Sequence, residues 1–254
     1  MKGFLIAMLL SFSTAALAQE LPSLNEPVFK EGEELHYKLK YGIISAAEGT
    51  LKVEHTDFQF DGKPVYHLLA YGKTSSAFSL FYNVNNRYDS YIDKETYLPY
   101  FYAENIREGK YQRTDKVRFK QASRTITATK GTFKGAVQTF DLLSAYYFAR
   151  NLDLSSVKNG DSFKLTYFLH DEVATLGITY IGKERISTPL GTFNCLKFSP
   201  EIAPGRIFRK DSKLYLWVTD DGNRIPVKAK VDILIGSVTL ELTGTKGLKY
   251  PLKK

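Results

Sequence analysis

Side chains that could carry chemistry are few and scattered in this chain of 254 residues. A nucleophile needs a general base beside it, and a metal site needs His, Cys or carboxylate ligands at a suitable spacing. The one cysteine, Cys195, lies in a strand-like segment and is predicted to be a buried structural thiol. No His-x-His or His-Glu-x-x-His spacing joins the four histidines, which are His36, His55, His67 and His170. We therefore predict no catalytic residue, no metal site and no cofactor.

Three groups of residues suggest catalysis, but each has a simpler structural explanation. Ser144 lies outside a Gly-x-Ser-x-Gly motif and has no histidine nearby in the sequence, so we interpret it as a small packing residue. His170-Asp171-Glu172 could offer metal ligands, yet a solvated turn explains it better. Paired carboxylates would suit a glycosidase, but the candidates lie in turn sequences, which favour Asp: Asp93, Asp220 and Asp221.

Aromatic residues are the candidates for ligand binding. The chain has 17 Tyr and 17 Phe, and such side chains favour strands and large apolar cores. The uncharged segment Ser75–Tyr82 is predicted to be a core strand or short helix, or else a flap over a pocket. Arg150 would contact an anionic head group, or would pair with a buried carboxylate. The aromatic residues predicted to line a concave ligand site are Tyr37, Tyr41, Phe78 and Phe81.

The elements that must position these residues are mostly strands. Apolar and polar residues alternate over several segments, a pattern typical of antiparallel strands with one face in a core. Turn sequences rich in Asp, Asn, Gly and Pro separate these segments. The clearest alternating segments are Leu35–Tyr41, Phe163–Leu169, Leu214–Val218, Val227–Ile233 and Val238–Leu242.

One segment breaks the alternation. The apolar residues of 140–152 recur at helical spacing, and Asp141 is a suitable N-cap because its carboxylate can accept hydrogen bonds from the first turn. Gly62 and Pro99 recur as Gly191 and Pro226 at nearly the same offset, which indicates two similar halves, roughly 30–135 and 158–245. The alternative explanation for these recurring positions is that similar hairpins occur in any β protein. We expect an all-β fold with one short central helix, whose mostly antiparallel curved sheets form a sandwich or an incomplete barrel.

The N-terminus predicts export. Met1–Ala18 has a positive start, an apolar stretch and an Ala-x-Ala site, as in a secretory signal peptide. Residues 19–254 would then form a single β-rich domain in the periplasm, or be secreted fully. No other long apolar stretch follows, so no transmembrane anchor is expected.

The net charge of +8 comes from scattered residues. It is typical of a solvated basic surface, although attraction to anionic lipids or acidic polymers is an alternative. The chain has no phosphate-binding glycine motif and no basic-aromatic pattern on a nucleic-acid fold, so we expect no nucleic-acid partner.

Four segments, taken in order, resemble a known family. The chain is similar to the bacterial domain of unknown function 3108 family over essentially its whole mature length. The resemblance implies an exported, β-rich protein without an assigned activity, similar in architecture to the open half-barrels of periplasmic lipoprotein carriers, which hold acyl chains in a concave apolar face. It carries over no catalytic residues. The matching segments are Phe29–Gly49, Asp141–Arg150, Thr188–Phe198 and Leu214–Leu242.

These observations favour a non-enzymatic binding or carrier protein. Its ligand would be a lipid or another apolar or amphipathic component of the envelope, held on an aromatic concave face. One alternative is an assembly protein that binds another envelope protein through strand edges or its basic face. An envelope hydrolase is the remaining alternative.

Overall fold

A computed structural model describes residues 21–254 except for residues 77, 80–81, 202–211 and 234–235. The predicted signal peptide therefore lies outside the described residues. The described chain forms one helix and sixteen strands. The elements before the helix are β1 (Glu34–Tyr41), β2 (Ile44–Glu54), β3 (Gln59–Phe60), β4 (Lys63–Thr74), β5 (Asn85–Asp93), β6 (Pro99–Glu108), β7 (Tyr111–Lys120), β8 (Thr125–Ala128), β9 (Gly131–Lys134) and β10 (Thr139–Phe140).

The helix separates these strands from a second series. Helix α1 (Leu142–Arg150) follows β10 directly. The five segments with the clearest alternation all form strands, as the sequence predicts. The second series comprises β11 (Ser162–Leu169), β12 (Glu172–Thr188), β13 (Gly191–Pro200), β14 (Leu214–Thr219), β15 (Pro226–Asp232) and β16 (Ser237–Lys246).

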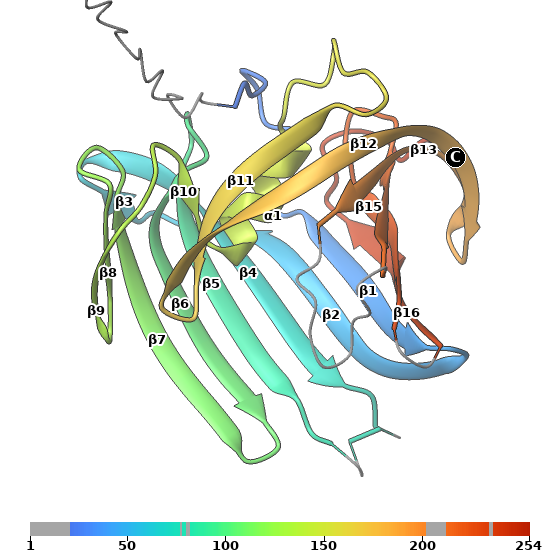
Figure 1. Cartoon of the computed structure of the whole chain (residues 1–254), viewed down its shortest axis with the longest axis horizontal. Coiled ribbons are helices and arrows are strands. Elements are labelled where there is room, and N and C mark those ends of the chain that lie inside the picture. The colour runs from blue at the N-terminus through green and yellow to red at the C-terminus, as the bar shows by residue number, and fades with distance from the viewer. Residues whose placement is uncertain (1–20, 77, 80–81, 202–211, 234–235) are drawn as a thin grey trace, which may run out of the picture.

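All these strands belong to one strongly curved sheet. Its order is β10-β11-β12-β13-β14-β15-β16-β1-β2-β4-β5-β6-β7-β8-β9, with β3 paired to β4. Neighbours are antiparallel except for the short parallel pair of β10 and β11. Strand β1 pairs with β16 on one side and β2 on the other, so it joins the C-terminal strands to the N-terminal ones. The sheet curls without closing, which confirms the all-β prediction and its incomplete-barrel form (Figure 1).

Helix α1 lies inside the curve of the sheet and packs against β4, β5 and β11 (Figure 1). Its N-terminus confirms the predicted cap. The carboxylate of Asp141 accepts hydrogen bonds from the backbone of Leu143 and Ser144, while the Ser144 hydroxyl accepts one from the Asp141 backbone. Ser90 also donates a hydrogen bond to Asp141, at 2.7 Å. These contacts fix the helix to the inner face of β5.

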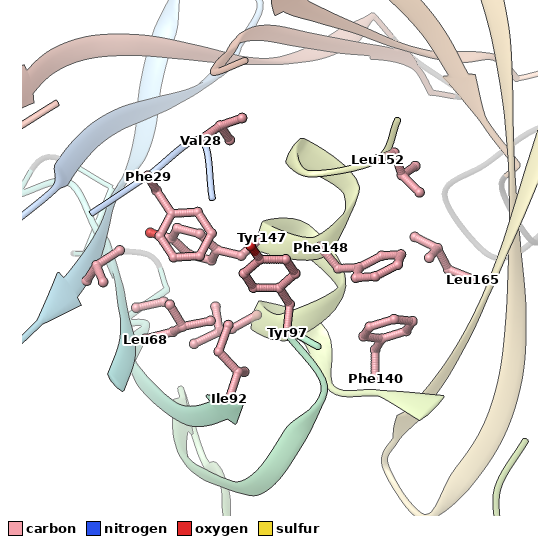
Figure 2. Packing of buried hydrophobic residues seen from close by; sticks show 13 residues of the cluster. Val28, Phe29, Leu68, Ile92, Tyr97, Phe140, Tyr147, Phe148, Leu152 and Leu165 are labelled. Carbon is pink, nitrogen blue, oxygen red and sulfur yellow. The ribbon is translucent and has the colours of Figure 1, made fainter. Parts of the chain in front are cut away.

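The main core surrounds this helix. Figure 2 shows Tyr147 and Phe148 of α1 among side chains from both halves of the chain. Phe29, which precedes β1, packs edge-on against Tyr147 with ring centroids 4.8 Å apart. On the other side, Leu165 of β11 joins the same cluster (Figure 2). Because the cluster draws on both strand series, neither series can bury its apolar residues alone.

Candidate functional site

The predicted ligand residue Tyr37 lies in the core. It is 5% exposed, and its hydroxyl donates a hydrogen bond to the carbonyl oxygen of Pro226. The same hydroxyl lies 3.0 Å from that of Tyr146 on α1. Tyr37 therefore points from β1 toward the helix. It marks which face of β1 is the inner face, and it has no surface left for a ligand.

Arg150 does not reach the surface either. Its side chain is 2% exposed and makes a two-pronged contact with the Glu33 carboxylate, at 2.6 Å and 2.9 Å. It also donates to the carbonyl oxygen of Asn223 at 3.0 Å. The carboxylate raises the pKa of Arg150 above its ordinary value, against the effect of burial. We therefore correct the head-group prediction for Arg150, while the alternative, pairing with a buried carboxylate, is confirmed.

The remaining predicted ligand residues lie in different places. Tyr41, at the end of β1, is 39% exposed. Phe78 lies in a turn after β4, where its backbone N–H donates to the Ser75 carbonyl, and it is partly buried. Phe81 lies outside the described residues. The structure thus separates Tyr37 and Arg150, which are core residues, from Tyr41 on a more open part of the inner face.

Tyr41 belongs to an apolar surface that the sequence alone did not delimit. Residues directly opposite each other on neighbouring strands point to the same face, so the register defines the surface. Two rows run side by side across β14, β15, β16, β1 and β2, on the inner face that Tyr37 marks. We call these ten residues the inner floor: Leu216, Ala229, Leu240, Leu39 and Ala47 in one row, and Leu214, Val231, Val238, Tyr41 and Ile44 in the other.

The inner floor is partly open to solvent. None of its residues is buried, whereas Leu242 and Tyr37, one step nearer to α1, are 0% and 5% exposed. Beside the floor, Gly72 of β4 faces Gly49 of β2, which in turn faces Tyr37. A Cβ atom added at Gly72 would meet no atom within 4 Å. The helix thus covers one part of the inner face and does not cover this apolar part.

The opposite part of the inner face is polar. Arg113 of β7 binds the carboxylates of Glu104 at 2.6 Å, Asp115 at 2.7 Å and Asp171 at 3.1 Å. Asp171 lies in the turn between β11 and β12, so this cluster fastens that hairpin against β6 and β7. The sequence indicated only a solvated turn at Asp171, because the partners lie on distant strands. The available signal in the sequence was that Glu104 and Asp115 stand two residues from the apolar Tyr102 and Val117, and so point to the same face of their strands.

The residues considered for catalysis form no catalytic group. The hydroxyl of Ser144 is engaged with the Asp141 backbone and is fully buried. Asp93 lines a cleft of about 450 Å³ that is separate from the one lined by Asp220 and Asp221. Cys195 is 1% exposed, and burial raises its pKa to about 12, so it is the predicted structural thiol. Among the described residues, no group of three or more His, Cys, Asp or Glu side chains is placed to hold a metal ion.

Comparison with known proteins agrees with this architecture. The family model described as "Protein of unknown function (DUF3108)" matches residues 36–243. The chain belongs to this family. No curated protein matches the sequence. Within the described residues, no helix has the length and apolar character needed to cross a bilayer.

Solved structures of similar fold are distant in sequence. A β-barrel-like protein of domain of unknown function DUF1849 from Brucella abortus has a TM-score of 0.54 at 10% identity, with 86% of this chain and 98% of that chain covered. A Bacteroides fragilis protein described as "a putative exported protein with YmcC-like fold" has a TM-score of 0.40 at 12% identity, with 89% of this chain and 100% of that chain covered. A "putative lipoprotein" from Parabacteroides distasonis has a TM-score of 0.38 at 12% identity, with 90% of this chain and 100% of that chain covered. The first of these supports the barrel-like fold.

Proposed function

We propose that this protein is an exported, non-enzymatic carrier or binding protein for an apolar or amphipathic component of the bacterial envelope. The observation that carries the proposal is the inner floor, two rows of partly exposed apolar side chains on the concave side of the sheet. A curved apolar surface next to a rigid core is a suitable place for an acyl chain, because each buried CH₂ group contributes about 0.8 kcal/mol. The signal peptide predicted from the sequence supports a location of this surface outside the cytoplasm.

The open space at Gly72 gives the proposal a sharp test. The variant Gly72→Phe would place a ring beside the inner floor, and its Cβ would meet no atom within 4 Å. Strand β4 also tolerates an aromatic residue well. We expect this variant to fold normally and to bind a fluorescent fatty acid about tenfold more weakly than the natural protein, a change of about 1.4 kcal/mol.

The matched control places the same ring on the other face of the sheet. Thr114 of β7 is exposed and lies opposite Asn105, which lies opposite Arg87 on the outer face. Thr114→Phe should leave binding unchanged. Native mass spectrometry of the protein purified from the periplasm should show a bound amphiphile. A mass without any bound molecule, together with no binding of the fluorescent fatty acid, would contradict the proposal and favour the assembly-protein alternative.

A further inference from the structure

A second feature lies at the far end of the inner floor, in the loop between β14 and β15. A cleft of about 320 Å³ opens there and has both an apolar and a polar side. Its apolar side includes residues that follow α1 and residues of β12 and β13. The lining residues that matter here are Leu154, Val157, Tyr180 and Leu196 on the apolar side, and Lys183 and Arg224 on the polar side.

Arg224 is fixed in an unusual backbone conformation. Its φ of 49° lies in the left-handed region, which residues other than glycine seldom adopt. The Asp221 carboxylate holds this conformation by accepting hydrogen bonds from the backbone of Asn223 at 2.9 Å and of Arg224 at 3.1 Å. Asn223 is anchored in turn by its side chain, which contacts the backbone of Tyr250. The loop therefore presents the Arg224 side chain from a rigid base.

The guanidinium of Arg224 forms no ion pair with a described residue, although the carboxylates of Asp153 and Asp220 act on it from beyond 4 Å. It donates one hydrogen bond, from Nη1 to the carbonyl oxygen of Leu152. Among the described residues, no carboxylate lies within 4 Å of it, and its Nε and Nη2 atoms contact no acceptor. Burial lowers its pKa below the ordinary arginine value. By contrast, Arg150 binds Glu33 and Arg113 binds three carboxylates, so the half-buried charge of Arg224 is an exception.

The carboxylates around Arg224 are already engaged, and that of Asp153 accepts a hydrogen bond from the Ser155 backbone at 3.0 Å. Asp221 accepts hydrogen bonds from the loop backbone, from the Thr219 hydroxyl at 2.7 Å and from the Lys253 backbone. Asp220 accepts one from Lys183 at 2.7 Å. Two guanidinium nitrogens of Arg224 thus remain to bind an anion, and a planar fork of this kind suits a carboxylate or a phosphate group.

The apolar side of the cleft joins the inner floor through Tyr180 and Phe198, which are 6% and 7% exposed and form one apolar cluster with Leu216. Tyr180 lies opposite Phe198 in the register of β12 and β13, and Phe198 lies opposite Leu216 of the floor. From Leu216 the row passes through Ala229 and Leu240 to Leu39. Five strand spacings separate β12 from β1 along this row, a distance of about 24 Å at about 4.8 Å per strand. This is the scale of an extended acyl chain.

We propose that the cleft at Arg224 binds the carboxylate or phosphate head group of an anionic amphiphile, whose chain passes Leu154 and Val157 and lies along the row from Leu216 to Leu39. This inference rests on the proposed carrier function and adds the charge of the ligand and its orientation. Arg224 provides the counter-charge, and Leu154 and Val157, which are partly exposed, receive the first part of the chain. A neutral amphiphile would occupy the floor without the contact to Arg224.

Three probes share an oleyl chain and differ in the head group, so they separate the contributions of head group and chain to the affinity. They are oleate, oleyl alcohol and oleoyl lysophosphatidate. Their affinities are measured by displacement of a fluorescent fatty acid from the full mature protein and from the variant Arg224→Gln. We expect the natural protein to bind the anionic probes about tenfold more tightly than oleyl alcohol. Arg224→Gln should remove this preference and leave the affinity for oleyl alcohol unchanged, which also shows that the variant folds.

The control variant is Arg118→Gln, since Arg118 is half-exposed on β7 and should not affect binding. Oleate bound more tightly than lysophosphatidate identifies a carboxylate site, and the reverse order identifies a phosphate site. Equal affinities for all three probes, or an equal loss of all three in Arg224→Gln, would overturn the head-group inference and leave the carrier proposal standing. No binding of any of the three probes would overturn both.

Discussion

At the scale of single residues, the buried ion pair of Arg150 and Glu33 is the contact whose loss should cost most stability. Arg150 is buried with Glu33, and it also lies over the rings of Phe29 and Tyr147. Removing one partner of such a pair leaves an uncompensated charge in the core. We predict that Glu33→Gln lowers the free energy of unfolding by about 3–5 kcal/mol, measured by urea denaturation.

The control for this prediction is an exposed pair. Glu48 lies 4.0 Å from Lys73, and both side chains are largely exposed. Glu48→Gln should lower the free energy of unfolding by at most about 1 kcal/mol, because water screens the interaction. Equal losses for the two variants would show that the Glu33–Arg150 pair does not hold α1 and the loop at Asn223 together.

At the scale of elements, the β11–β12 hairpin is held against β7–β9 by Asp171 and by Phe168, whose ring packs against Phe133 at 5.0 Å. Hydrogen bonds from Lys130 and Arg113 hold the pKa of Asp171 below its ordinary value of 3.8. The contact therefore stabilises the closed hairpin above pH 3.8 and is lost as the pH falls below that value. We predict that Asp171→Asn speeds hydrogen exchange at residues 168–173 at neutral pH.

The same exchange measurement supplies the pH test. The difference between the natural protein and Asp171→Asn should shrink as the pH falls through 3.8 toward the lowered pKa, because the natural side chain then loses its charge. Asp57→Asn is the control, since Asp57 has a side chain that is 98% exposed. A difference that is independent of pH would mean that the charge of Asp171 does not fasten the hairpin.

At the scale of the whole molecule, the two strand series depend on each other. Strand β1 pairs with β16 from Glu34↔Lys246 to Tyr41↔Val238, and the core around α1 includes Phe29, which precedes the helix in the chain, and Leu165, which follows it. We predict that cutting the chain at a protease site inserted between Ser155 and Ser156, which are exposed, leaves a folded complex. The two fragments should co-elute in size-exclusion chromatography and separate in urea. Fragments that separate without denaturant would contradict the shared core.

The sequence by itself determined the local elements. Alternation along residues such as Leu35–Tyr41 predicted strands, because successive side chains point to opposite faces of a sheet. The spacing within 140–152 and the cap at Asp141 predicted the helix, because capping depends only on neighbours in the chain. The burial of Cys195 also followed from its strand context. The division into two similar halves stays a prediction.

Only the tertiary structure decided which of these residues meet. Tyr37 and Tyr41 alternate in phase on one strand, yet α1 covers Tyr37 and leaves Tyr41 on the inner floor, since strand periodicity fixes the face of a side chain and not what lies above it. Arg150 and Arg224 look alike in sequence, but Glu33 reaches only Arg150. Charge compensation depends on contacts between distant segments, and this is why the proposed head-group site became visible only in the folded chain.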